Sequence, residues 1–234
     1  MEGIWVIRLI IIYTTMYFLS HPISSLNHFI ARLVTDQICF ISSLILFIII
    51  AIAYKKPFWQ NIDQAVSEWA TEPRDSLIRN ISGNFAIFGN AIFHILFSIV
   101  LSVILFITKH STSIVFAILF TLVFSWALNR LMKLIYKRER PEHLNTNVRK
   151  RLSYCFPSGH VMASISIYFF SAVLLQSFVP FLPWYLIAFV ISFFIIMSRI
   201  YLNHHYFTDV LSGIAMGIFS LNISIWFYFF VGII

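Results

Sequence analysis

Residues Pro157–Phe178 read PSGHVMASISIYFFSAVLLQSF, a short polar turn followed by an apolar run. A helix needs about 20 mostly apolar residues to cross a bilayer, and the run that begins at His160 is of this length. The stretch therefore predicts a membrane helix that opens on a histidine. A titratable ring at such a position raises the question of what chemistry the rest of the chain places beside it.

The composition of the whole chain agrees with a membrane protein. Of 234 residues, 60% are hydrophobic and only 11% are charged, whereas soluble domains carry about 25% charged residues. This balance excludes an ordinary soluble domain. Two cysteines, Cys39 in an apolar run and Cys155 in a polar loop, are too few for a disulfide framework.

Six apolar segments predict an all-α fold, an integral membrane helical bundle with six core transmembrane helices. We place the six-helix domain at residues 37–234 and an N-terminal extension at residues 1–36. Within that extension, residues 3–19 are apolar apart from Arg8 and fit either an extra span or an interfacial helix. The six segments run through Gln37–Tyr54, Phe85–Ile107, Ser113–Lys133, His160–Phe178, Trp184–Leu202 and Phe207–Ile234.

A polar stretch between the first two segments has helical spacing of apolar residues. Phe58, Ile62 and Trp69 recur at this spacing, and tryptophan is enriched at membrane interfaces. We expect a short amphipathic helix on the surface near the mouth of a site, with Asn61 or Asp63 capping its start. A plain connector is the alternative.

A first group of polar residues ends the third segment. Seven of the sixteen Lys and Arg residues fall between residues 133 and 151. Lys133, Lys137 and Arg140 would share one face if the helix continued past Lys133, and Pro141 would help to end it. Alone, the cluster also fits a surface anchor for anionic lipid head groups.

A second group opens the fourth segment. Ser158 is a natural N-cap, and His160 falls in the first helical turn. Helix N-termini bind phosphate through their unpaired N–H groups, and Gly159 lets a ligand approach the backbone closely. Alone, this group also fits an ordinary capped helix with an interfacial histidine.

A third group joins the last two segments. Arg199 ends the fifth segment, and His205 and Asp209 are one helical turn apart. A carboxylate that binds one imidazole nitrogen fixes the tautomer and leaves the other nitrogen as base or nucleophile. His204 lacks this four-residue relation to Asp209. A histidine–aspartate helix cap at the membrane edge is the alternative.

Because consecutive spans alternate in direction, the three groups lie on the same side of the membrane. Charged residues at membrane depth are costly and indicate function. Cationic side chains, a helix N-terminus and two histidines would then converge. This combination predicts a phosphate site in which one histidine attacks and the other donates a proton.

Together the three groups resemble the signature of the type 2 phosphatidic acid phosphatase superfamily. They read K-x6-R-P from Lys133 to Pro141, P-S-G-H from Pro157 to His160, and S-R-x5-H-x3-D from Ser198 to Asp209. The resemblance covers about residues 37–234. It implies a six-helix membrane core and hydrolysis of phosphomonoesters or diphosphates without a metal or other cofactor.

The resemblance also implies a role for each matching residue. His205 is the nucleophile that forms a phosphohistidine, Asp209 orients it, and His160 is the general acid and then the base for water. The phosphoryl oxygens are held by the remaining matched residues, which are Lys133, Arg140, Ser158, Gly159 and Arg199. Lys137, Arg138 and the run Arg149–Arg151 lie outside these roles as extra positive charge for an anionic head group.

The expected substrate is a lipid phosphate or diphosphate drawn from the surrounding membrane lipids. Undecaprenyl pyrophosphate, phosphatidylglycerophosphate, phosphatidic acid and lipid A phosphates all fit, and we expect no nucleic-acid partner. A lipid phosphotransferase that uses the same phosphohistidine and a non-catalytic anionic-lipid binding protein are the alternatives. The sequence leaves the exact lipid and the oligomeric state open.

The length of the chain, near that of a minimal six-span core, favours a bacterial envelope lipid, so we expect the chain in a bacterial inner membrane. The resemblance implies that its site lies on the extracytoplasmic side. The positive-inside rule, applied to the basic loop after Lys133, would instead place that loop in the cytoplasm. A phosphate site needs its positive charges wherever the substrate is, so we follow the resemblance.

Overall fold

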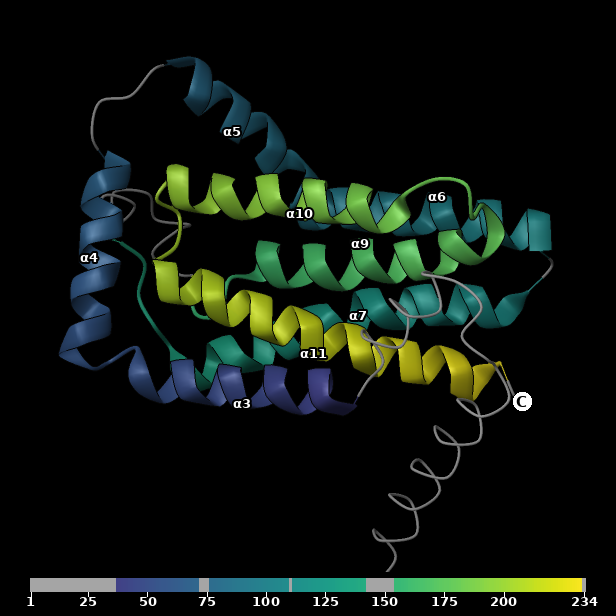
Figure 1. The fold of residues 1–234 in the computed structure, drawn as a ribbon, viewed down its shortest axis with the longest axis horizontal. Helices are drawn as coiled ribbons and strands as arrows, with labels where there is room; N and C mark the ends of the chain where they lie inside the picture. Colours follow the sequence, from purple (N-terminus) through teal and green to yellow (C-terminus); the bar gives the residue numbers. More distant parts are fainter. Residues whose placement is uncertain (1–36, 72–75, 110, 142–153, 233–234) are drawn as a thin grey trace, which may run out of the picture. The chain divides into compact units, whose positions relative to one another are not determined.

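The computed structural model describes residues 37–71, 76–109, 111–141 and 154–232, and it places most of them in helices (Figure 1). The predictions for residues 3–19, for the boundary at residue 36 and for Arg149–Arg151 lie outside these residues. The helices are α3 (Gln37–Ala53), α4 (Pro57–Thr71), α5 (Ser76–Phe88), α6 (Ala91–Lys109), α7 (Thr112–Tyr136), α9 (Gly159–Phe178), α10 (Trp184–Tyr201) and α11 (Phe207–Val231).

Five of the described helices, α6, α7, α9, α10 and α11, are long and apolar enough to cross a bilayer. A sixth is counted only if α3 and α4 form one span, and these two helices are bent by 91° at the break between them. Because backbone polar groups have no water to bind in hydrocarbon, helices are the expected solution. The prediction of an all-α membrane bundle is confirmed.

Helix α9 occupies the centre of the bundle and packs against α7, α10 and α11. In the most apolar stretch of α9, 67% of the residues are buried, against 28% for α6, α7 and α10. Two glycines let α11 approach it closely, because a Cβ on Gly213 would lie 2.8 Å from the Ser158 carbonyl oxygen and one on Gly217 would lie 2.8 Å from the Ile165 Cβ. Small residues at membrane-helix contacts commonly serve this purpose.

The helix that forms the second predicted span begins several residues after the start of the apolar run that predicted it. The run begins near Phe85, but α5 ends at Phe88 and α6 begins at Ala91. Gly89 sits at the break, where a Cβ would lie 2.9 Å from the Ile195 side chain and 3.1 Å from the His160 ring. The chain therefore turns here beside the predicted site, and an apolar pattern alone does not reveal such a turn.

Helix α4 is the predicted amphipathic surface helix, and α5 follows it as a second helix. Figure 1 shows α4 crossing the end of the bundle, where it contacts α10 and α11. Phe58 and Trp69 are exposed, whereas Asp63 is the buried residue of this helix. The helix begins at Pro57, so neither Asn61 nor Asp63 caps its start, and that prediction is wrong.

Candidate active site

The end of α7 differs from the prediction. The helix stops at Tyr136, and Lys137 adopts the left-handed conformation with φ 47°. Lys133, Lys137 and Arg140 therefore do not share a helical face, and the Lys137 side chain is exposed. Lys133 and Arg140 are partly buried, one on the last turn of α7 and the other on the segment that follows it.

The segment after α7 is fixed to the loop that leads into α9. The Cys155 N–H donates to the Arg138 carbonyl at 2.9 Å, and the Cys155 thiol donates to the Glu139 carbonyl at 2.9 Å. Burial raises the pKa of the Cys155 thiol, so it stays protonated and serves as a donor. Arg140 in turn donates to the His204 carbonyl at 2.8 Å, which joins this segment to the turn between α10 and α11.

His205 and Asp209 lie together at the start of α11. The Nδ1 atom of His205 is 3.5 Å from Oδ2 of Asp209, and both side chains are buried. The same carboxylate oxygen accepts the Tyr206 N–H at 3.0 Å. A separation of 3.5 Å is long for a hydrogen bond, and contacts of this kind shorten when the site is loaded.

The His205 ring is neutral at physiological pH. Burial lowers its pKa from 6.5 to about 4, against the opposing effect of Asp209 and with the help of the positive charges of Arg140 and Lys133. The Asp209 carboxylate faces Nδ1 at 3.5 Å, which favours the tautomer with the proton on Nδ1 and the lone pair on Nε2. The arrangement leaves a neutral imidazole nitrogen as a nucleophile or base.

Arg138 is the residue that sequence analysis misassigned. Its NH1 donates to Oδ1 of Asp209 at 2.7 Å and its NH2 donates to Oδ2 of Asp63 at 2.6 Å. Burial alone would lower the pKa of Arg138, but Asp209 and Asp63 outweigh burial and raise it. The guanidinium is therefore committed to two carboxylates, and the prediction that it awaits an anionic head group is wrong.

Asp63 caps a different helix from the one that carries it. Its Oδ1 accepts the Thr208 N–H at 2.9 Å, and its Oδ2 accepts the Thr208 hydroxyl at 2.6 Å. An unpaired N–H in the first turn of α11 is thereby satisfied from α4. The sequence signal for this role is faint, because it consists of an acidic residue on the buried side of a helix whose Phe58 and Trp69 face outward.

Ser158 occupies the predicted N-cap of α9 without using its side chain. The hydroxyl makes no side-chain cap hydrogen bond, and it is buried with no partner among the described residues. The backbone N–H of Ser158 donates to the Asp209 carbonyl at 2.9 Å. Close packing explains why a glycine stands at position 159, because a Cβ there would lie 2.8 Å from Oδ1 of Asn129.

His160 lies beside the other predicted site residues. It is within electrostatic range of Arg199, His205 and Lys133. Its Nε2 is 3.0 Å from Oδ1 of Asn90, a residue that sequence analysis missed because it falls at the break between α5 and α6. Since Nε2 is engaged, Nδ1 is the ring atom left for proton transfer.

Arg199 is a buried cation with an unused donor. Its side chain is 3% exposed, its Nε donates to the Ser198 hydroxyl at 3.2 Å, and its NH2 has no partner among the described residues. Buried unpaired donors on a charged group are costly and rare. Together with the unpartnered hydroxyl of Ser158, this NH2 fits a site for an anion.

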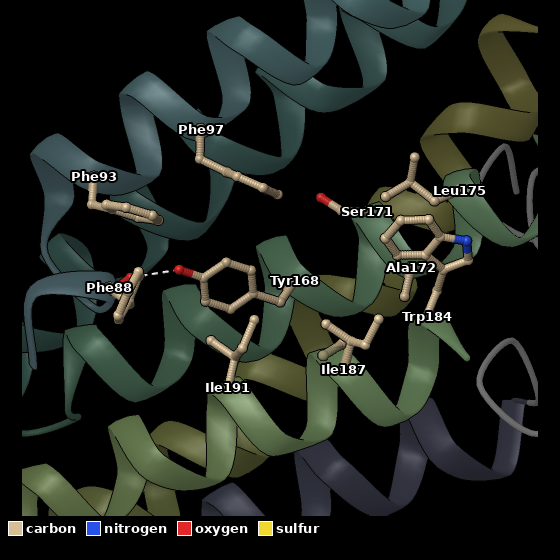
Figure 2. Close-up of a pocket in the computed structure, with 11 residues that line it drawn as sticks. Phe88, Phe93, Phe97, Tyr168, Ser171, Ala172, Leu175, Trp184, Ile187 and Ile191 are labelled. Atoms are coloured by element: carbon tan, nitrogen blue, oxygen red, sulfur yellow. Dashed lines mark hydrogen bonds between the residues drawn. The ribbon is translucent and has the colours of Figure 1, made fainter. Parts of the chain in front are cut away.

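An apolar groove lies between α6, α9 and α10. It has a volume of about 180 Å³, and Figure 2 shows Phe88 and Phe93 at one end and Trp184 at the other. At the first end, the Tyr168 hydroxyl donates to the Phe88 carbonyl at 2.6 Å. Phe88 is two residues before Asn90, which contacts His160, so this end of the groove is close to the site. The groove is lined by Phe88, Phe93, Phe97, Tyr168, Ser171, Ala172, Leu175, Trp184, Ile187, Ala188 and Ile191.

Comparisons with known proteins identify the family and the fold. The sequence model of the PAP2 superfamily matches residues 112–232. Phosphatidylglycerophosphatase B of Bacillus subtilis (strain 168) is 29% identical over 183 residues, which cover 76% of this chain and 89% of that protein. The crystal structure of a transmembrane PAP2 type phosphatidylglycerolphosphate phosphatase from Bacillus subtilis superposes with a TM-score of 0.75 at 26% identity, over 82% of this chain and 96% of that one.

The environment of His205 predicts its titration. NMR of the histidine rings in detergent micelles, with His205→Asn to assign the signal, should show a ring that stays neutral until the pH falls to about 4. Because the unfolded ring binds a proton near pH 6.5, His205 should make unfolding easier as the pH falls from 6.5 toward 4. A midpoint near 6.5 in the folded protein would contradict the buried environment.

Proposed function

The chain belongs to the PAP2 superfamily, and from this membership we propose that it is an integral membrane phosphatase that hydrolyses a lipid phosphate ester, with phosphatidylglycerophosphate as the leading candidate. The observation that carries the proposal is the group formed by Arg199, Ser158 and His205. It combines a buried guanidinium N–H and a buried hydroxyl, both without partners among the described residues, with a neutral imidazole. A phosphate would satisfy both unpaired groups.

The reaction proceeds in two steps. Nε2 of His205 attacks phosphorus and forms a phosphohistidine as the bond to the leaving oxygen breaks, while His160 gives that oxygen a proton. His160 begins the cycle as an imidazolium, so giving up its Nδ1 proton leaves it neutral. It then removes a proton from water, which attacks phosphorus, releases inorganic phosphate and returns both histidines to their starting states. Asp209 stabilises the positive charge that the His205 ring gains, as carboxylates do for catalytic histidines.

Positive charge and N–H donors hold the phosphoryl oxygens through both steps. Phosphoryl transfer depends mainly on positioning and charge stabilisation. A group of cationic side chains and N–H or O–H donors, here called the cradle, supplies both without a metal ion. Its members are Lys133, Arg140, Ser158, the Gly159 N–H and Arg199.

The apolar groove supports a lipid as the substrate. A chain that follows α9 away from His160 would remain in apolar surroundings as far as Trp184. Each buried methylene contributes about 0.8 kcal/mol, so a groove of this kind favours a long acyl or isoprenoid tail over a soluble phosphate ester. Phosphatidylglycerophosphate also agrees with what the two similar Bacillus subtilis proteins are named for.

We also propose that the site faces the extracytoplasmic side of a bacterial inner membrane. The support is the family resemblance of the three motifs. A cysteine introduced at exposed Lys137 in intact cells should react with a membrane-impermeant maleimide. Labelling only after the membrane is opened would place the site in the cytoplasm.

Phosphate release from a panel of lipid phosphates in detergent tests the activity. The panel contains phosphatidylglycerophosphate, phosphatidic acid and undecaprenyl pyrophosphate, and EDTA is present throughout. His205→Ala should reduce the rate at least about 1,000-fold, as loss of a covalent nucleophile does, whereas His204→Ala should keep most of it. Vanadate, which resembles the five-coordinate transition state, should inhibit.

Other outcomes of this assay identify the alternatives. Transfer of phosphate to an added acceptor lipid in place of release would indicate a phosphotransferase. Phosphate binding without turnover would indicate a lipid-binding protein. Activity that EDTA abolishes and Mg²⁺ restores would rule out the metal-independent mechanism.

Two matched tryptophan substitutions on α10 test the groove. Ile187 lines the groove and is 39% exposed, whereas Val190 lies outside it and is 41% exposed. Ile187→Trp should raise the KM for a long-chain lipid phosphate about tenfold, equivalent to about two methylene groups left unburied. It should leave p-nitrophenyl phosphate hydrolysis unchanged, and Val190→Trp should affect neither substrate. Equal effects of the two variants would show that the tail binds elsewhere.

A further inference from the structure

We propose that Asp63 is a positioning residue for the reaction, acting through Arg138 and Asp209 on His205. This inference rests on the proposed function, because it concerns the same histidine. Asp63 lies on α4, outside the three motifs and before the region that the family model matches. Its side chain is 2% exposed and binds Arg138 at 2.6 Å, Arg138 binds Asp209 at 2.7 Å, and Asp209 lies 3.5 Å from the His205 ring.

The argument begins with how a guanidinium pairs with a carboxylate. Arginine prefers to bind one carboxylate through two parallel N–H···O bonds. In this structure Arg138 does not, because NH1 meets Asp209 while NH2 meets Asp63. Asp209 therefore uses only Oδ1 for Arg138, and Oδ2 remains for the Tyr206 N–H and the His205 ring.

Asp63 holds the NH2 group of Arg138 away from Asp209, so that only NH1 binds Asp209. It is anchored by the Thr208 N–H and hydroxyl, at 2.9 and 2.6 Å, so its carboxylate cannot move freely toward or away from Arg138. The rings of Tyr54 and Tyr206 lie 4.9 and 4.2 Å from the Arg138 guanidinium carbon and restrict its movement as well. Without the Asp63 charge, Arg138 could turn both N–H groups onto Asp209 and compete with His205 for Oδ2.

Asparagine is a suitable replacement because it keeps the size of Asp63 and removes its charge. The two carboxylate oxygens accept from different donors, the Thr208 N–H on one side and Arg138 NH2 with the Thr208 hydroxyl on the other. An asparagine amide would place an NH2 group against one of these sets of donors in either orientation. The Asp63→Asn protein should therefore fold with a displaced Arg138.

Ser67 provides a matched control on the same helix. One turn beyond Asp63, its hydroxyl and the Asn203 amide are joined at 2.8 and 3.0 Å. Ser67→Ala thus removes another polar contact between α4 and the site end of the bundle without touching Arg138. If α4 were merely loosened, kcat would fall in both variants. If Asp63 acts by positioning Asp209, kcat should fall only in Asp63→Asn.

The experiment is a double-mutant cycle on the full chain in detergent, with phosphatidylglycerophosphate as substrate. Asp63→Asn should lower kcat about 10- to 100-fold, as the loss of partners that orient a functional histidine does elsewhere, with KM and vanadate inhibition within about threefold. In an Asp209→Asn background the same change should have little further effect, because the residue through which it acts is already altered. Ser67→Ala should have the same small effect in both backgrounds.

A second readout is independent of turnover. Nitrogen-15 NMR should show the Nδ1–H tautomer of His205 in the unaltered chain and a mixture of tautomers in Asp63→Asn. If no substrate is hydrolysed but the tautomer shifts, the proposed function fails and the positioning role stands. If Asp63→Asn does not fold, Arg138→Lys takes its place, since a lysine keeps the charge but lacks the rigid planar fork that gives each carboxylate its own arm.

Three results would overturn the proposal. The first is an unchanged kcat and tautomer in Asp63→Asn, and the second is an equal loss of kcat in the Asp209→Asn background. The third is an effect on KM alone, which would place Asp63 in substrate binding.

Discussion

Arg138 binds two buried carboxylates at once, and the rest of the site depends on this pairing. An isolated charge inside a protein is strongly unfavourable, so Asp209 can be fully buried beside His205 only with a cation at hand. The same guanidinium joins three parts of the chain, which are the segment after α7, the start of α11 and the surface helix α4. Removing either carboxylate would leave one arm of the guanidinium without its carboxylate partner.

This pairing sorts the charges of the site into two groups. The two buried carboxylates, Asp63 and Asp209, are satisfied by Arg138, Thr208 and backbone donors. Lys133 and Arg199 have no carboxylate partner among the described residues, so the proposed function assigns their positive charge to the substrate phosphate. A site whose carboxylates are already bound to Arg138 keeps its other cations available for an anion, and Asp209 stays beside the histidine.

Much of this could be predicted from the sequence because the matched residues sit in three short segments at helix ends. Alternating spans bring those ends together, and the four-residue spacing of His205 and Asp209 places the two side chains in contact. The Asp63–Arg138 pair could not be predicted, since 75 residues separate its members and α4 carries no motif. The end of α7 could not be predicted either. Lys137 adopts a left-handed conformation, and the residues that usually signal such a conformation, glycine and asparagine, are absent from this position.

The region matched by the family model does not contain both of the carboxylates that bind Arg138. The family region begins at residue 112, whereas the second carboxylate that binds Arg138 comes from residue 63. Consider a chimaera in which the amino-terminal half of a relative is joined to this chain from residue 112 onward. Such a chimaera would contain every motif residue of this chain. Unless that relative supplies a carboxylate at the same place on its surface helix, the chimaera would leave one arm of the guanidinium without its anion.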